Sequence, residues 1–245
     1  MESNWRELLR HPNQGDHMVQ VCQDGEFLGE ALGEYIGTGL NCGEAALVIA
    51  RPEQRAKLSP GRDQLKLLDA EETLARIMTG GIPEWRSFQD IVGRAIAELR
   101  RRFVRVRVYG AMVDLLWQRG RGEAALKLEE YWNALGRVHR FSLLCAYSMD
   151  PLAASAYGGP LERVCRAHTH LIPVRDYNRL NDAVSEASRK VLDRPLAQML
   201  LSLSANHRPA THMPLGQATL IWLKQNMPRT ADKILSEVRA RWGAA

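Results

Sequence analysis

The chain has 245 residues, of which 45% are hydrophobic and 25% are charged, and its formal net charge is +5. These values are typical of a folded globular protein and exclude a disordered or low-complexity chain. No segment approaches the roughly 18 apolar residues of a membrane span, and residues 1–16 lack the basic start and apolar run of a secretory signal. We therefore expect a cytoplasmic protein without membrane contact. Its widely spaced cysteines are expected to be free thiols: Cys22, Cys42, Cys145 and Cys165.

The first 174 residues alternate between short β-rich runs and helical patterns. Strands are predicted at residues 17–22, 44–50, 64–69, 104–108, 141–147 and 168–172. In the fourth of these, valines alternate with Arg105 and Arg107, which predicts one polar face. Helices are predicted between the strands, including residues 25–35, 85–102, 112–118, 123–135 and 160–167. This alternation predicts an α/β fold, with a mostly parallel sheet and helices on both faces.

From residue 175 onward the pattern is all-helical, with helices predicted at residues 178–192, 195–204, 215–226 and 229–242. The charge balance changes at the same place. Residues 1–174 hold 22 basic and 22 acidic residues, whereas residues 175–245 hold 11 and 6, so the tail carries the net charge. We predict two domains, 1–174 and 175–245. A basic tail could bind nucleic acid or an acidic partner, but its charges are dispersed, which favours a solvated helical face.

The sequence contains none of the common catalytic motifs. After the first strand, residues 23–28 offer one glycine, two acidic residues and no lysine, so a phosphate loop is not expected. No G-x-S-x-G motif occurs, and Cys145 within an apolar strand is expected to be inert. The paired carboxylates Glu71/Glu72 and Glu129/Glu130 are expected at a helix start or on solvated faces. We therefore predict that the protein is not an enzyme.

The motif Cys165-x-x-His168-x-His170 is the nearest approach to a metal cluster. Two histidines separated by one residue share a face of a strand and could bind one ion. A hydrogen-bonding role is favoured, because no second pair of cysteine or histidine residues lies nearby in the sequence. A site would be completed only if the fold brought in His17, Cys22 or Cys145. We expect no metal and no cofactor.

Ligands of parallel sheets bind at the carboxyl ends of the strands. The candidate ligand-binding residues lie at or near these ends: Cys22, Asp24, Arg51, Asp69, Tyr109, Met112, Tyr147 and His168. The aromatic residues of the following helices, Trp117, Tyr131 and Trp132, are expected mainly to pack in the core, although such side chains can also line an apolar pocket.

Several sequence blocks follow one another in a fixed order, among them Gly15-Asp-His-Met-Val-Gln20, Gly39-Leu-x-x-Gly-Glu-Ala-Ala-x-Val-Ile-Ala50, Leu128-Glu-x-x-Trp-Asn-x-Leu135 and Leu143-Leu-Cys-Ala-Tyr147. Together these blocks resemble the MEDS sensory domain of methanogens and methylotrophs. The resemblance covers about residues 14–174. It implies a RecA/KaiC-like domain that has lost its phosphate loop. Such domains occur in bacterial and archaeal signalling proteins and are proposed to sense small organic molecules.

The chain departs from the family pattern at three strand ends. Ala111 stands where the family usually has Glu, Gln54 where it has His, and Val21-Cys22-Gln23-Asp24 where it has an aromatic and acidic pair. These differences imply either an altered ligand selectivity or a domain used for protein contacts alone.

The resemblance predicts a non-catalytic sensory or regulatory protein of signal transduction or transcription control, which binds a small organic ligand or a protein partner. Two alternatives stay open: an interaction adaptor without a small ligand, and a residual nucleotide-binding RecA-like protein. The expected partners are a signalling or transcription-control protein, nucleic acid through the basic tail, or a second copy of the chain.

Overall fold

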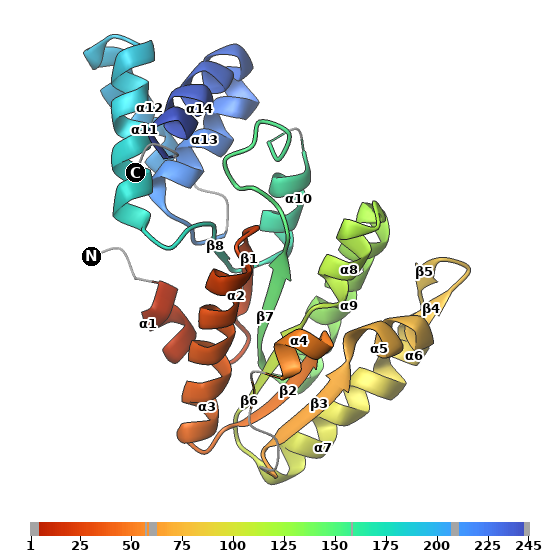
Figure 1. The fold of residues 1–245 in the computed structure, drawn as a ribbon. Coiled ribbons are helices and arrows are strands. Elements are labelled where there is room, and N and C mark those ends of the chain that lie inside the picture. Colours follow the sequence, from red (N-terminus) through yellow and green to blue (C-terminus); the bar gives the residue numbers. More distant parts are fainter. Residues whose placement is uncertain (1–4, 57, 59–62, 158, 207–210, 243–245) are drawn as a thin grey trace. The chain divides into compact units, whose positions relative to one another are not determined.

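The computed structural model describes residues 5–242, apart from 57, 59–62, 158 and 207–210 (Figure 1). The described residues up to Ser148 form one compact unit, and those from Met149 form another. We call these the first and the second unit. The predicted domain boundary at residue 174 stays a prediction.

Five parallel strands form the sheet of the first unit. Their spatial order is β3 (Leu65–Asp69), β2 (Ala45–Ala50), β6 (Val106–Gly110), β7 (Ser142–Tyr147) and β1 (His17–Val21). Every residue of β1, β2, β6 and β7 is buried, because helices cover both faces of the sheet. The prediction of an α/β fold with a parallel sheet is confirmed, and its RecA/KaiC-like character stays an implication of the resemblance.

The helices of the first unit lie on the two sides of the strands (Figure 1). One side carries α1 (Trp5–Arg10), α2 (Gly25–Leu32), the π-helical turn η1 (Gly33–Gly37) and α3 (Thr38–Asn41). The other side carries α7 (Arg94–Arg102), α8 (Met112–Gln118) and α9 (Gly122–His139). The helix predicted at residues 85–102 is continuous through α6 (Trp85–Phe88), η2 (Gln89–Gly93) and α7.

Short elements join these layers. Helix α4 (Pro52–Arg55) follows β2, and α5 (Ala70–Ile77) follows β3. A hairpin of β4 (Met78–Thr79) and β5 (Ile82–Pro83) was not expected from the sequence. Its turn is Gly80-Gly81, whose φ values of +57° and +85° strain any residue with a side chain.

The prediction that Arg107 lies on a polar face of the fourth strand is wrong. This strand is Val106–Gly110 rather than residues 104–108, and Arg107 is only 2% exposed. Its guanidinium donates to Glu44 at 2.5 Å and to the carbonyls of Leu9, Arg10 and Tyr35 at 2.8, 2.9 and 2.7 Å. The physical reason is α1, which the sequence did not predict. The last turn of α1 supplies two of the carbonyls that Arg107 requires when it is removed from water.

Gly39 of α3 permits this arrangement by its lack of a side chain. A Cβ atom at this position would lie 2.6 Å from the Cδ atom of Arg107. Because hydrogen bonds hold Arg107 on several sides, the arginine cannot move away from such a contact without losing some of them.

The second unit contains α10 (Pro160–Ala167), β8 (His170–Ile172) and four longer helices, which confirm the predicted helical tail. These are α11 (Tyr177–Val191), α12 (Arg194–Asn206), α13 (Leu215–Asn226) and α14 (Pro228–Trp242). Their shared core includes Leu180, Val184, Leu220, Ile234 and Val238, each fully buried. A β-bridge joins His170 to His212, so residues before 175 also belong to this unit.

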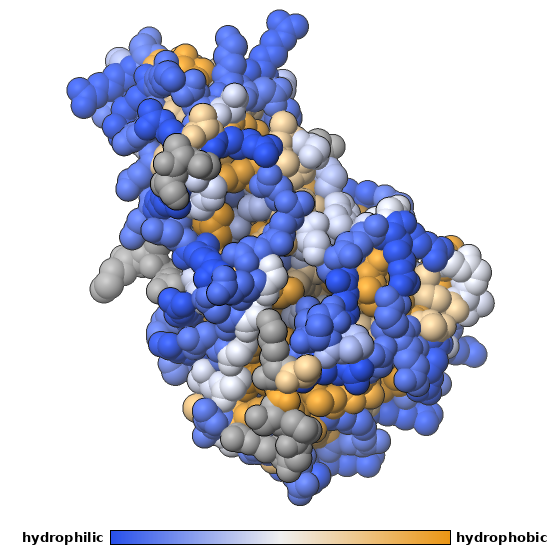
Figure 2. All heavy atoms as spheres, viewed as in Figure 1, coloured by the Kyte–Doolittle hydropathy of each residue, from blue (hydrophilic) through white to orange (hydrophobic). Residues whose placement is uncertain are grey.

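Hydrophilic residues predominate on the face of the molecule seen in Figure 2. The large apolar side chains that are exposed among the described residues are Ile82, Val104, Val138 and Met199. None of the described helices combines the length and the apolar character that crossing a membrane requires.

Candidate functional site

The carboxyl ends of the five strands lie at one edge of the first unit, which we call the carboxyl edge. Cys22 and Asp24 follow β1. The Asp24 carboxylate caps α2 by accepting hydrogen bonds from the amides of Glu26 and Phe27 at 2.9 and 3.0 Å. The half-buried Cys22 thiol lies 3.6 Å from the Asp24 carbonyl oxygen. Asp24 therefore stabilises the start of a helix, as N-cap residues commonly do.

Asp69 and Tyr109 occupy the ends of β3 and β6. The Asp69 carboxylate accepts a hydrogen bond from the Glu72 amide at the start of α5 and forms an ion pair with Arg55 at 2.7 Å. The Tyr109 hydroxyl is buried and accepts a hydrogen bond from Gln54 at 3.0 Å. Both predicted residues are thus engaged by side chains of α4.

The third group at this edge centres on Asp114 of α8, which the sequence analysis did not single out. Asp114 is 5% exposed and forms an ion pair with Arg51 at 3.0 Å. It also accepts hydrogen bonds from Gln118 and from the Ser148 amide, both at 2.7 Å. The sequence did offer a signal for Asp114, because this aspartate stands in the first turn of a helix that follows a buried strand. Met112, which begins α8, is fully buried.

The buried Tyr109 hydroxyl predicts a loss of stability at alkaline pH. Burial, and next the nearby charge of Asp114, raise the pKa of Tyr109 well above the ordinary value near 10. Above about pH 10 the unfolded chain releases this proton while the folded protein retains it. The stabilising contribution is therefore complete below pH 10. Above it, the free energy of unfolding falls by about 1.4 kcal/mol per pH unit for this group.

Tyr109→Phe should make this alkaline slope shallower by about that amount. Urea unfolding of the wild type and the variant, at a series of pH values above and below 10, measures the difference. An identical slope in the two proteins would show that Tyr109 is accessible to solvent.

Apart from the carboxyl edge, another polar group lies inside the first unit, between the sheet and α9. We call His17, Glu129, Cys145, Asn133 and Tyr147 the inner cluster. His17 begins β1, and Cys145 and Tyr147 alternate along β7 on the same sheet face as His17, as the strand register shows. Helix α9 supplies Glu129 and Asn133.

The side chains of the inner cluster contact one another directly. The Nε2 atom of His17 lies 3.2 Å from Oε2 of Glu129 and 3.5 Å from Sγ of Cys145, and Sγ lies 3.7 Å from the same Oε2. The Tyr147 hydroxyl donates to Oε1 of Glu129 at 2.9 Å. The other ring nitrogen of His17 lies 3.0 Å from Oδ1 of Asn133.

The expectation that Glu129 and Glu130 lie on solvated faces is wrong for Glu129, which has no exposed surface. Glu130 is exposed and pairs with Lys127 at 2.7 Å. The physical reason is helical spacing. Glu129 lies four residues after the buried Ala125 and one residue after the buried Leu128. This spacing places it on the stripe of α9 that packs against the sheet. That spacing was visible in the sequence.

The sequence matches one known family. The model of MEDS, described as the methanogen/methylotroph, DcmR sensory domain, matches residues 16–169, which is more than half of the chain. The chain belongs to the MEDS family. No curated protein and no solved structure matches it. The family indicates a sensory or regulatory role, and both polar groups described above lie within the matched residues.

The inner cluster of this MEDS domain does not resemble an activated cysteine nucleophile. A cysteine beside a histidine that an asparagine orients is an arrangement known from catalytic thiols. However, burial and the neighbouring Glu129 raise the pKa of the Cys145 thiol well above its usual value, which disfavours the reactive thiolate. Cys145 is also fully buried and so offers no surface to a substrate.

A pocket of about 250 Å³ lies beside the inner cluster. It is lined by residues at the amino ends of β1 and β7 and by α9, including His17, Trp132 and Asn133. The indole Nε1 of Trp132 is buried and has no hydrogen-bond partner among the described residues. Sequence reasoning placed the ligand site at the opposite ends of these strands and did not identify this pocket.

The last predicted site residue, His168, lies in the second unit. It is 5% exposed, and its Nδ1 atom lies 2.7 Å from the Val164 carbonyl oxygen. Within the described part of the chain, Cys165 and His170 belong to no group of three or more metal-ligating side chains. His170 instead stacks on His212, with ring centroids 4.9 Å apart.

Proposed function

We propose that this chain is a non-catalytic sensory protein of cytoplasmic signal transduction or transcription control. Its MEDS domain binds a small organic molecule, and its helical unit transmits the bound state to a partner protein. The observation that carries the proposal is the family match to a sensory domain over residues 16–169.

The pocket beside the inner cluster is the binding site that we favour. Pockets for small molecules combine apolar or aromatic walls with a few polar groups that orient the ligand. Here Trp132, Phe141 and Leu143 supply apolar surface, and His17 and Asn133 supply polar atoms. The indole NH of Trp132 lies on the ring edge that packs beside Gly110 of β6, so we assign Trp132 to the apolar wall and the orienting role to His17 and Asn133.

Thermal unfolding of the full chain with panels of short-chain organic molecules and nucleotides tests this proposal. A ligand that binds only the folded state, present at 100 times its Kd, stabilises the protein by about 2.7 kcal/mol, which raises Tm. We expect Trp132→Phe, which reduces the aromatic wall of the pocket, to reduce that ligand-induced shift. Trp117→Phe, at a tryptophan of α8 that packs on Tyr147, should retain it. A panel without any shift would contradict the ligand-binding role.

The adaptor without a small ligand is the second candidate. It is favoured by the mutual pairing at the carboxyl edge, where Arg51 binds Asp114 and Arg55 binds Asp69. Under this proposal the MEDS domain contacts only proteins. Co-purification of a specific partner, together with no ligand-induced shift, would support it.

Nucleic-acid binding through the basic helices has less support. Within the second unit, Lys190 pairs with Glu237 at 2.6 Å and Lys224 pairs with Asp232 at 2.5 Å. These pairs reduce the positive charge available to phosphates. Binding to random duplex DNA that weakens steeply with salt would nevertheless revive this role.

A further inference from the structure

We propose that His17, Glu129 and Cys145 form a binding site for a zinc-like transition-metal ion inside the MEDS domain. The inference does not depend on the sensory function. From the sequence, His17 and Cys145 were considered only as additions to a site around Cys165, His168 and His170, and the family description assigns no residue to a metal.

The spacing of the three ligand atoms is that of a tetrahedral zinc site. Bonds of about 2.0–2.2 Å to nitrogen or oxygen and about 2.3 Å to sulfur, at tetrahedral angles, separate nitrogen from oxygen by about 3.3 Å. The same bonds separate sulfur from either atom by about 3.5 Å. The separations are 3.2 Å for Nε2 and Oε2, 3.5 Å for Sγ and Nε2, and 3.7 Å for Sγ and Oε2. An ion could therefore be bound with side-chain movements of a few tenths of an ångström.

The donor set selects the class of metal. An imidazole, a thiolate and a carboxylate together are typical of zinc and related transition ions, whereas magnesium and calcium prefer oxygen ligands alone. Three protein ligands leave a fourth tetrahedral position for water or another donor. The cation would also balance the negative charges of the thiolate and the carboxylate, which the buried setting otherwise disfavours.

Two further residues orient the ligands. If Nδ1 of His17 donates to Asn133, the lone pair of Nε2 is directed to the centre of the cluster. The Tyr147 hydroxyl binds Oε1 of Glu129 and leaves Oε2 beside the histidine and the thiol. Such outer partners commonly fix ligands around protein-bound metals. His17 and Asn133 also line the pocket at the amino ends of β1 and β7, through which we expect the ion to enter.

The same three side chains could instead form a hydrogen-bonded cluster without an ion. Cobalt distinguishes the two, because a thiolate bound to tetrahedral Co²⁺ produces a strong charge-transfer band and intense visible absorption. The full chain is stripped with a chelator and titrated with Co²⁺, followed by competition with Zn²⁺. We expect one ion per chain, a thiolate band that Zn²⁺ abolishes, and a Tm roughly 5–10 °C higher at 100 times the Kd of zinc.

Variants assign the site. Cys145→Ser should abolish the thiolate band, and Asn133→Ala should weaken metal binding by about 10–100-fold while keeping the band. Cys165→Ser is the matched control at another buried free cysteine, and Cys22→Ser and Cys42→Ser remove the more accessible thiols. All three controls should retain the band, which assigns it to Cys145 even if Cys145→Ser fails to fold. A cobalt spectrum without a thiolate band, or loss of the band in a control variant, would overturn the proposal in favour of the hydrogen-bonded cluster.

Discussion

Replacing Arg107 with Met should lower the free energy of unfolding of the first unit by about 3–5 kcal/mol. The substitution removes one partner of a buried ion pair and leaves Glu44, whose side chain is 11% exposed, without that guanidinium. It also removes the donor that serves three backbone carbonyls of α1 and η1. Since small domains are stable by only about 5–15 kcal/mol, this loss is large enough to threaten folding at physiological temperature.

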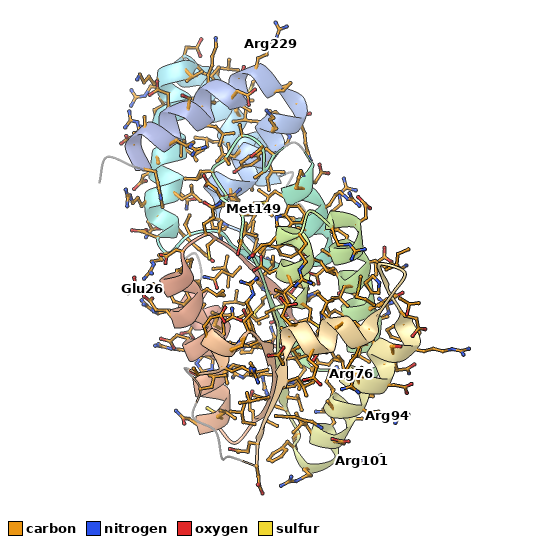
Figure 3. The ribbon with its side chains drawn as sticks, turned by 45° about the vertical axis from the view of Figure 1, so that its right-hand side comes forward. Glu26, Arg76, Arg94, Arg101, Met149 and Arg229 are labelled. Atoms are coloured by element: carbon orange, nitrogen blue, oxygen red, sulfur yellow. The ribbon has the colours of Figure 1, made fainter. Side chains whose placement is uncertain are left out.

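Arg94→Met is the matched control for Arg107→Met. Arg94 projects from α7 (Figure 3), and its pair with Asp90 is exposed at both ends. We expect this control to change stability by less than about 0.5 kcal/mol. Urea unfolding gives the free energies, and hydrogen exchange of the β6 amides reports the first unit separately. A loss below about 1 kcal/mol for Arg107→Met would mean that α1 does not hold this side chain away from water.

Glu129→Ala should cost about 2–4 kcal/mol, while Glu130→Ala should cost less than about 0.5 kcal/mol. The first change deletes a fully buried carboxylate, leaves a cavity under α9 and removes the acceptor of the Tyr147 hydroxyl. The second removes only an exposed carboxylate that pairs with the neighbouring Lys127. Two adjacent glutamates should therefore differ strongly in one measurement.

The comparison of the two glutamate variants is made on chelator-treated protein, so that a bound metal ion does not contribute. Glu129→Gln serves as the conservative variant, because it keeps the volume and an acceptor oxygen for Tyr147. We expect its cost to lie between those of the two alanine variants. Equal, small effects at both positions would show that α9 does not bury Glu129 against the sheet.

The architecture of this protein follows from short-range patterns in the chain. An uninterrupted apolar run such as residues 45–50 has one stable environment, the interior of a parallel sheet covered on both faces. Together with the other β-rich runs it made the five strands of the first unit predictable within about two residues. Amphipathic spacing likewise identified α8, α9 and the four helices of the second unit.

Two of the errors concern charged residues whose environment depends on distant segments. Arg107 alternates with valines and so predicts a polar face, yet α1 lies nearly a hundred residues earlier and removes that face from water. Asp114 was overlooked because its partners Arg51 and Ser148 come from two other strand ends.

The sequence by itself therefore determined the fold class, the helical second unit, the absence of the phosphate-loop motif and the membership of the MEDS family. These depend on local periodicity and on blocks of residues in a fixed order. Only the tertiary structure decided which polar groups meet. It paired Asp69 and Tyr109 with α4 and Arg51 with α8. It also brought His17, Glu129 and Cys145 within 3.7 Å of one another from two strands and a helix. Whether a charged side chain is solvated or buried depends on its neighbours in space. Such neighbours can be distant in the sequence: His17 and Glu129 are more than a hundred residues apart.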